Sequence, residues 1–252
     1  MSLQKRPIHL LIGIDDTDNL DSRGTGYHAR SIGAAMDENN WGECNVITRH
    51  QLLVSPHVPF TSHNSAACIT VATSSDHVDD ISSFCRDYLI NESAEGSDPG
   101  LCIADTSQVN HAMIQFGFLA KHQVVTQDDA HDIAKQACVS LQGLGGDFQG
   151  VIGALASVGL NGSGSDGRML WLKGMRERAE QNVSVGELLN DSGIDVIQSL
   201  EGQVISDQDL IIAMGAWPRA IWIGGKATLI IEQSTENADV WQVARKEYLR
   251  QF

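Results

Sequence analysis

The sequence predicts an α/β protein in which a buried strand runs into an acidic loop and then a helix. Ile8–Ile14 (IHLLIGI) is a short apolar run, which is typical of a buried strand. It stops abruptly at Asp15–Asp18 (DDTD), and helical spacing follows over Tyr27–Asn39. A loop between a strand end and a helix is where α/β folds commonly present a site. With 252 residues, the chain can form one large domain or two small ones.

The remaining elements follow from apolar periodicity and β-branched content. Strands are predicted at Val46–Val54, Ala66–Thr73, Leu101–Ala104, Arg168–Lys173, Val196–Ser199, Val204–Ile205, Ala220–Ile223 and Thr228–Glu232. Helices are predicted at Val78–Asn91, Ser107–Ala120, Gln127–Leu141, Val151–Val158 and Glu236–Arg250. Ser184 is a candidate cap for a short helix through Leu189.

Composition limits the classes of function. The formal net charge is −15, and Lys and Arg neutralising phosphates drive most nucleic-acid affinity. We therefore expect weak or no nucleic-acid binding by the chain alone. No apolar run approaches the roughly 20 residues that a membrane helix needs, so no membrane association is expected. Five scattered cysteines without a CxxC pair argue against a zinc ribbon and are typical of reduced thiols in the cytoplasm.

The acidic loop is the first candidate site. Asp15, Asp16 and Asp18 stand just beyond the buried strand, where their charges repel each other. A hard cation relieves that repulsion, and Mg²⁺ prefers one or two carboxylates together with phosphate oxygens. The loop has no Glu at the twelfth position of an EF-hand. The alternative is a solvated loop whose aspartates cap the next helix.

The second candidate is a glycine-rich segment that enters a helix. Gly145–Gly150 (GGDFQG) precedes the small, apolar run that begins at Val151. Free backbone N–H groups at such a helix start can hold an anion, although the same pattern also fits a tight turn into a closely packed helix. Gly162–Gly167 matches GxGxxG in the wrong structural context. Gly225-Lys226 lacks the other residues of a P-loop.

Four segments, taken in order, resemble one known family. They are Gly13–Asp18 with Gly24–Tyr27; Pro56, Val58 and Pro59 with Asn64–Ala67; Ser97–Leu101; and Gly145–Gly159 (GGDFQGVIGALASVG). The first and last are the most specific. Together they resemble blocks of the archaeal tRNA-Ile agmatinylcytidine synthetase (TiaS) family.

The resemblance implies a fold and a site. It implies a kinase-like ATP and Mg²⁺ domain over 1–60 and 143–252, and a ferredoxin-like domain over 61–142. That family uses ATP to activate a tRNA cytidine through a phosphorylated intermediate, which agmatine then displaces. The threonine matching Thr25 becomes phosphorylated. The resemblance implies catalytic roles for Asp15, Asp16, Asp18 and Thr25, with the aspartates holding metal, and nucleotide contacts from Thr17, Gly24, Asn64, Gly145, Gly146, Gly150 and Gly153.

The sequence also departs from the family. Gly24 and Gly26 flank Thr25 where the family has Cys and Thr, and the family's OB-fold and zinc-ribbon modules have no counterpart. The resulting hypothesis is an ATP- and Mg²⁺-dependent phosphotransferase or ATPase. Its acceptor, a small molecule or RNA, is left open, as is a homo-oligomer. Two alternatives are an RNA-modifying enzyme that relies on a partner to bind RNA, and a non-catalytic nucleotide sensor.

Overall fold

The computed structural model of the chain describes residues 6–58, 63–235, 237 and 240–252. The chain divides into two compact units, Met1–Ser163 and Gly164–Phe252. The kinase-like and ferredoxin-like domains, with the bounds given above, stay a prediction. Pro59 and the predicted boundary between 60 and 61 lie outside the described residues.

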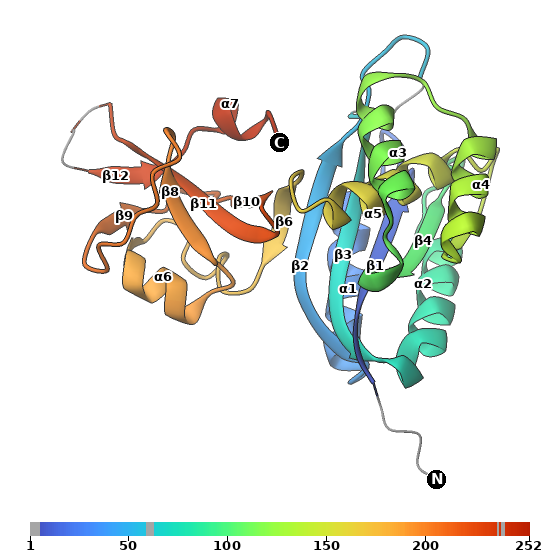
Figure 1. The fold of residues 1–252 in the computed structure, drawn as a ribbon, viewed down its shortest axis with the longest axis horizontal. Coiled ribbons are helices and arrows are strands. Elements are labelled where there is room, and N and C mark those ends of the chain that lie inside the picture. The colour runs from blue at the N-terminus through green and yellow to red at the C-terminus, as the bar shows by residue number, and fades with distance from the viewer. Residues whose placement is uncertain (1–5, 59–62, 236, 238–239) are drawn as a thin grey trace. The chain divides into compact units, whose positions relative to one another are not determined.

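The first unit is built on one antiparallel sheet (Figure 1). Its strand order is β5-β4-β1-β3-β2. The strands are β1 (Pro7–Asp15), β2 (Gly42–Gln51), β3 (Ser65–Ser74), β4 (Gly100–Asp105) and β5 (Ser140–Gly143). Strand β1 is therefore the central strand of this sheet. Asp15 is its last residue and pairs with Gly100, the first residue of β4.

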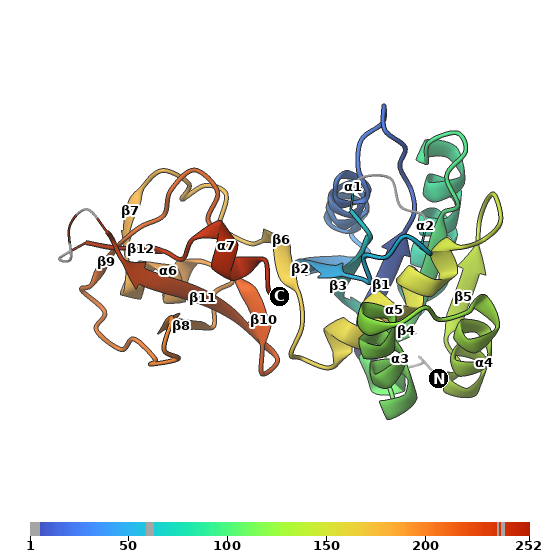
Figure 2. The ribbon, with the colours of Figure 1, turned by 90° about the horizontal axis from the view of Figure 1, so that it is seen from above.

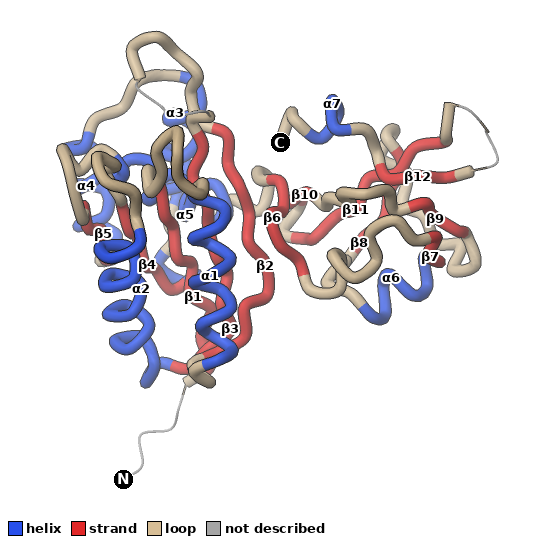
Figure 3. Tube along the Cα trace, turned by 180° about the vertical axis from the view of Figure 1, so that it is seen from behind, coloured by secondary structure: helices blue, strands red, loops and turns tan. Residues whose placement is uncertain are grey.

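Helices cover both faces of this sheet (Figure 2). On one face lie α1 (Thr25–Glu38) and α2 (Val78–Glu92), which Figure 3 shows in front of the strands. On the other face lie α3 (His111–His122), α4 (Gln127–Ala137) and α5 (Gly150–Gly162). From Leu10 to Ile14, strand β1 is apolar and buried, as expected of a central strand with helices on both faces. Short 3₁₀ turns at Ser75–His77 and Thr106–Gln108 precede α2 and α3.

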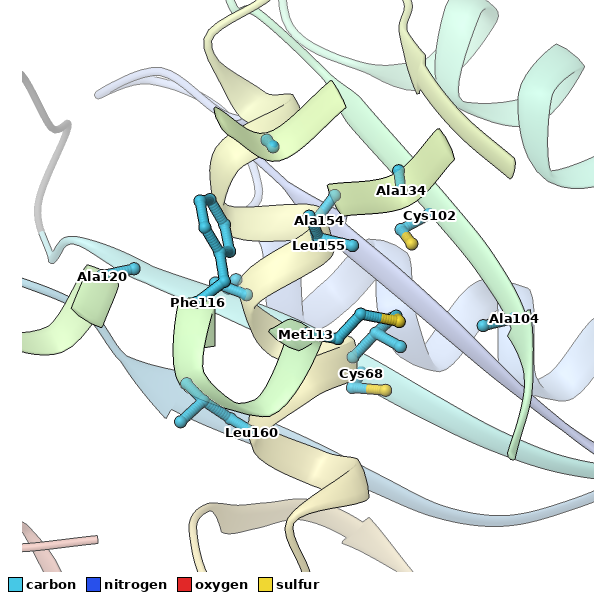
Figure 4. Close-up of a cluster of buried hydrophobic side chains, with 14 of the residues drawn as sticks. Cys68, Cys102, Ala104, Met113, Phe116, Ala120, Ala134, Ala154, Leu155 and Leu160 are labelled. Atoms are coloured by element: carbon cyan, nitrogen blue, oxygen red, sulfur yellow. The ribbon is translucent and has the colours of Figure 1, made fainter. Parts of the chain in front are cut away.

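The core between the sheet and α5 is made of small and sulfur-containing side chains (Figure 4). Cys68 of β3 and Cys102 of β4 belong to the same buried cluster as Ala154 and Leu155 of α5 and Phe116 of α3. All five are at most 2% exposed. This packing fixes the start of α5 against the end of β1, which is what positions the site.

The second unit is a smaller mixed sheet with two short helices. Its strand order is β6-β10-β11-β12-β9-β7, and β8 pairs in parallel with β11. The strands are β6 (Arg168–Leu172), β7 (Asn182–Ser184), β8 (Val196–Ser199), β9 (Ile211–Ala213), β10 (Ile221–Ile223), β11 (Lys226–Gln233) and β12 (Trp241–Val243). The helices are α6 (Val185–Asp191) and α7 (Lys246–Leu249). Ser184 caps α6, as predicted, by accepting a hydrogen bond from the Glu187 amide at 3.1 Å.

Two predicted helices were wrong over part of their length. The helix predicted over Gln127–Leu141 ends at Ala137, because Cys138 takes a left-handed conformation (φ 56°) and the next residues pair with β4. In the helix predicted over Glu236–Arg250, Trp241–Val243 is a strand that pairs with both β9 and β11. Residues 236, 238 and 239 of that prediction lie outside the described residues. In both cases strand pairing overrides a local helical pattern.

Within the described parts of the chain, no helix combines the length and the apolar character needed to cross a bilayer.

Candidate functional site

The acidic loop begins with a sharp change of backbone direction at the end of β1. Asp16 takes a left-handed conformation, with φ of 51°, which Asp and Asn tolerate better than most residues. The loop is fastened at two points to the turn after α2. The Thr17 carbonyl accepts a hydrogen bond from the Ala94 amide at 3.0 Å, and the Asn19 side chain donates to the Glu95 carbonyl at 3.2 Å.

Asp18 and Thr25 close the loop by hydrogen bonds. The Thr25 hydroxyl donates to Asp18 Oδ1 at 2.9 Å, and the Thr25 amide approaches the same oxygen at 3.3 Å. Asp18 therefore supplies the polar contact at the start of α1, where Gly24 has no side chain to offer. The predicted helix-capping alternative is correct for this aspartate, and it is compatible with a role in the pocket.

A pocket of about 700 Å³ opens beside this loop, entirely within the first unit. Six of the predicted site residues line it: Asp15, Asp16, Asp18, Thr25, Asn64 and Gly153. They come from β1, the acidic loop, α1, the approach to β3 and α5. The Asn64 side chain donates to the Leu53 carbonyl at 2.7 Å, which joins the chain just after β2 to the chain just before β3.

Five predicted site residues do not line the pocket. Thr17 is fully buried, and its hydroxyl donates to Thr25 Oγ1 at 3.0 Å. Gly24 is exposed on the loop, with Asp18 as its nearest neighbour. Gly145 and Gly146 lie in the turn that leads into α5, and Gly150 is the first residue of that helix.

The glycines of that turn have close neighbours that explain the missing side chains. A Cβ on Gly150 would lie 2.3 Å from the Asp98 carbonyl oxygen and 2.5 Å from the Gly100 amide nitrogen. A Cβ on Gly146, which has a positive φ of 54°, would collide with the Asp98 carboxylate. The amides of Gly150, Val151 and Ile152 already donate to backbone carbonyls at 3.1–3.3 Å. Of the two interpretations of this segment, an anion site and a tight turn into a closely packed helix, these contacts favour the tight turn.

Gly153 differs from these glycines because the Asp15 side chain occupies the space that a Cβ on Gly153 would need. A Cβ there would lie 1.9 Å from Asp15 Oδ2. The Asp15 carboxylate therefore lies directly on the first turn of α5. The acidic loop and the glycine segment, which are more than 100 residues apart in the sequence, meet at this point.

The electrostatics of the pocket are those of crowded carboxylates. Burial, with added repulsion from Asp16 and Asp18, raises the pKa of Asp15 from 3.8 to about 7. Burial, followed by repulsion from Asp98, raises the pKa of Asp16 as well. Among the described residues that line the pocket there is no Lys or Arg. His57 and His63 are the lining residues with basic side chains.

Sequence reasoning missed Asp98 and the apolar wall. Asp98 lines the pocket and interacts electrostatically with Asp16, and its Oδ1 accepts a hydrogen bond from the Asp147 amide at 3.1 Å. Asp98 lies in the segment Ser97–Leu101, and the resemblance of that segment to a family block could have indicated a role for Asp98. The wall carried no signal because its residues come from loops and helix ends. It consists of Leu52, Leu53, Val58, Ala120, Val124, Val125 and Ile152.

The donor set suits a hard divalent cation bound together with a ligand. No group of three or more His, Cys, Asp or Glu side chains among the described residues is arranged to hold a metal ion by itself. Mg²⁺ does not need such a cage, because it commonly takes one or two carboxylates and completes its shell with phosphate oxygens and water. Burial first, and then repulsion between the carboxylates, raises the pKa values of Asp15 and Asp16, and a bound cation would favour the charged form of both groups.

No family model matches the chain, and no curated protein matches it. Solved structures show the fold: over 60% of its length, the chain has a mixed α/β fold similar to part of several solved structures. The particular protein that it resembles is TiaS, a tRNA agmatidine synthetase. The apo crystal structure of TiaS is 24% identical, with a TM-score of 0.52. The complex of TiaS with its tRNA and ATP is 25% identical, with a TM-score of 0.53.

A second solved structure, described as a tRNA fluorescent labeling enzyme, gives the same values of 25% identity and TM-score 0.53. In each case 60% of this chain is matched, and the match spans only 35–36% of the other chain. The chain therefore corresponds to about a third of these proteins. The similarity supports a TiaS-like fold.

Proposed function

We propose that this pocket binds ATP with Mg²⁺ and that the chain transfers the γ-phosphoryl group. The observation that carries the proposal is the meeting of the acidic loop with the start of α5 around one pocket. A triphosphate brought into a pocket lined by aspartates, with no Lys or Arg among its described lining residues, needs metal ions to offset the repulsion. TiaS has been solved with ATP, which supports the choice of nucleotide.

The lining of the pocket offers groups that suit both parts of a nucleotide. Asp15, Asp16 and Asp18 would hold Mg²⁺, and the bound ion would offset charge on the phosphates. The apolar wall and the Asn64 side chain suit a planar base. Gly153 keeps α5 close to Asp15, while Gly145, Gly146 and Gly150 hold the turn that carries Gln149 into the lining.

Thr25 is the proposed phosphate acceptor within the chain. Its hydroxyl lines the pocket, 2.9 Å from an Asp18 oxygen that can receive the proton. In the proposed step, Thr25 Oγ1 bonds to the γ-phosphorus, the bond from that phosphorus to the bridging oxygen breaks, and ADP leaves. The hydroxyl proton passes to Asp18. Catalysis of this kind depends on positioning and charge neutralisation.

The molecule that finally accepts the phosphoryl group is either a small molecule or an RNA in this proposal. TiaS complexes contain tRNA and, in one case, agmatine with an ATP analogue, which favours an RNA acceptor as the second candidate. Residues 1–163 contain 8 Lys and Arg against 19 Asp and Glu, a formal charge of −11; residues 164–252 contain 9 against 13, a charge of −4. We therefore expect weak tRNA binding by the chain alone. Filter binding that gave sub-micromolar affinity at about 0.15 M salt would contradict this.

The decisive experiment is titration of the full chain with ATP by calorimetry, in Mg²⁺ and again in EDTA, followed by incubation with γ-labelled ATP. We expect Mg²⁺-dependent binding and label on Thr25, located by phosphopeptide mass spectrometry. A Thr25→Val variant should bind ATP without taking up label. Binding without any turnover would indicate the nucleotide sensor, and no binding in Mg²⁺ would end the proposal.

A further inference from the structure

Thr17 lies in the middle of the acidic motif, yet it cannot touch a ligand in the pocket. Its side chain is fully buried and is absent from the lining, whereas Asp15, Asp16 and Asp18 on either side of it all reach the pocket. Its hydroxyl nevertheless contacts the site, because it donates to Thr25 Oγ1 at 3.0 Å. A buried hydroxyl aimed at the proposed acceptor atom calls for an explanation.

The direction of the two hydrogen bonds gives one. An ionised carboxylate only accepts hydrogen bonds, so the proton of Thr25 must point to Asp18 Oδ1, 2.9 Å away. The oxygen of Thr25 is then left to accept, and the donor is Thr17. The hydroxyls and the carboxylate form a one-way chain from Thr17 to Thr25 to Asp18. This chain holds the Thr25 proton on the group that would receive it.

The backbone around Thr17 is fixed, which makes such a chain effective. The Ala94 amide donates to the Thr17 carbonyl at 3.0 Å, so the residue is tied to the turn after α2 as well as to α1. Thr25 is the first residue of α1, and its amide also approaches Asp18 Oδ1. Side-chain rotation at Thr25 is therefore restricted from two sides. Placement within a few tenths of an ångström matters for a nucleophile.

We infer that Thr17 is a positioning residue for phosphoryl transfer: it fixes the Thr25 oxygen and orients its proton toward Asp18. The inference rests on the proposed function, since it needs Thr25 to be the acceptor. As the Thr25 oxygen bonds to phosphorus and its proton leaves, negative charge builds on that oxygen. The Thr17 donor would stabilise this charge without touching the nucleotide.

The test compares the full-length wild type with Thr17→Val and Thr17→Ser. The rate of label transfer from γ-labelled ATP to Thr25 is measured at several ATP concentrations in Mg²⁺. Thr17→Val keeps the side-chain volume and removes the donor. We expect it to lower the maximal rate about tenfold, the effect of one hydrogen bond, with the KM for ATP changed less than about twofold. Thr17→Ser keeps the donor and should stay within about threefold of wild type.

A matched control separates positioning from simple loss of a buried hydroxyl. Thr48 is also fully buried in the first unit, and its hydroxyl is hydrogen-bonded to the Cys68 carbonyl and to His50, outside the pocket lining. Thr48→Val should lower the melting temperature while leaving the labelling rate of the folded protein unchanged. If Thr17→Val fails to fold, the Thr17→Ser result still decides, because a positioning donor requires that serine support fast labelling.

The outcomes separate the acceptor role of Thr25 from the positioning role of Thr17. A wild-type chain that never carries label on Thr25 overturns both roles together. A labelled wild type with Thr17→Val equally fast overturns the positioning role alone. Thr17→Ser as slow as Thr17→Val would also overturn it, because packing of the methyl group would then be what matters.

Discussion

The acidic loop and the glycine segment lie against each other, but they contribute to the site in opposite ways. In the loop, carboxylate and hydroxyl side chains reach the pocket. In the segment, Gly146 packs against the Asp98 carboxylate and Gly150 packs against the backbone of Asp98 and Gly100. Three amides at the start of α5 already donate to backbone carbonyls. A glycine-rich helix start therefore indicates close packing at least as strongly as it indicates an anion site. Gly153, beside Asp15, is where the two roles meet.

The largest expected effect is on the loop side of this comparison. Asp16→Asn should lower ATP turnover about a hundredfold or more, because it removes a carboxylate proposed to hold Mg²⁺. The fold should persist, since Asn also tolerates the left-handed conformation that residue 16 adopts. Steady-state kinetics in Mg²⁺ measures the first expectation and thermal unfolding the second.

The matched control is Asp132→Asn, which removes a carboxylate that is exposed on α4 and does not line the pocket. It should retain wild-type turnover. Equal turnover in the wild type and in Asp16→Asn would place the chemistry elsewhere.

On the glycine side, Gly150→Val should act on stability first. The new side chain would meet the backbone of Asp98 and Gly100 at 2.3–2.5 Å, and overpacking of this kind costs about 1–3 kcal/mol or more. Urea unfolding measures the loss. Gly24→Ala is the control, because its Cβ would meet only Asp18 Oδ2, at 3.7 Å, and its φ is −69°. If Gly150→Val unfolds like the wild type but no longer binds ATP, then Gly150 serves nucleotide binding and not packing.

The same contrast explains what could be predicted from the sequence. The strand at Ile8–Ile14 and the loop after it were predictable because apolar periodicity and an abrupt carboxylate cluster are local signals. The meeting of Asp15 with Gly153 followed only from a family resemblance, since no local pattern links positions so far apart. The apolar wall could not be predicted, because residues such as Leu52 and Val125 come together only through tertiary packing.

Strand pairing accounts for the other misses. Ser140–Gly143 and Trp241–Val243 are short segments with no strand periodicity of their own, and each is a strand because an edge of β4 or β11 is available to pair with it. Thr17 was expected to contact the nucleotide because it lies within DDTD. Its inward orientation depends on the turn at Asp16, a backbone feature that the motif does not reveal.

A smaller effect on ATP binding is expected from a substitution at Gly153, which lies against Asp15. Gly153→Ala places a methyl group 1.9 Å from Asp15 Oδ2, so the carboxylate must move. We expect ATP affinity in Mg²⁺ to fall about tenfold, whereas helix propensity favours Ala by about 1 kcal/mol and should limit any loss of stability. Calorimetry on the wild type, Gly153→Ala, Asp15→Asn and the double variant forms a cycle. The two changes should be strongly non-additive, because they act on one contact; additive losses would mean that Gly153 acts independently of Asp15.

The smallest expected effect is a pH dependence of stability that belongs to the loop alone. The pKa of Asp15 is about 7 in the folded chain against an ordinary value of 3.8. Between these values the folded state holds a proton that the unfolded state has lost, so the contribution of Asp15 to stability falls as pH rises through 7. In EDTA, we expect the wild type to lose on the order of 1 kcal/mol between about pH 6 and 7.5 relative to Asp15→Asn, as measured by urea unfolding. Added Mg²⁺ should reduce that loss, because a cation on the carboxylates favours their charged form. Parallel pH profiles for the two proteins would show that Asp15 titrates normally, and the carboxylate crowding that sets the loop apart from the glycine segment would lose its energetic support.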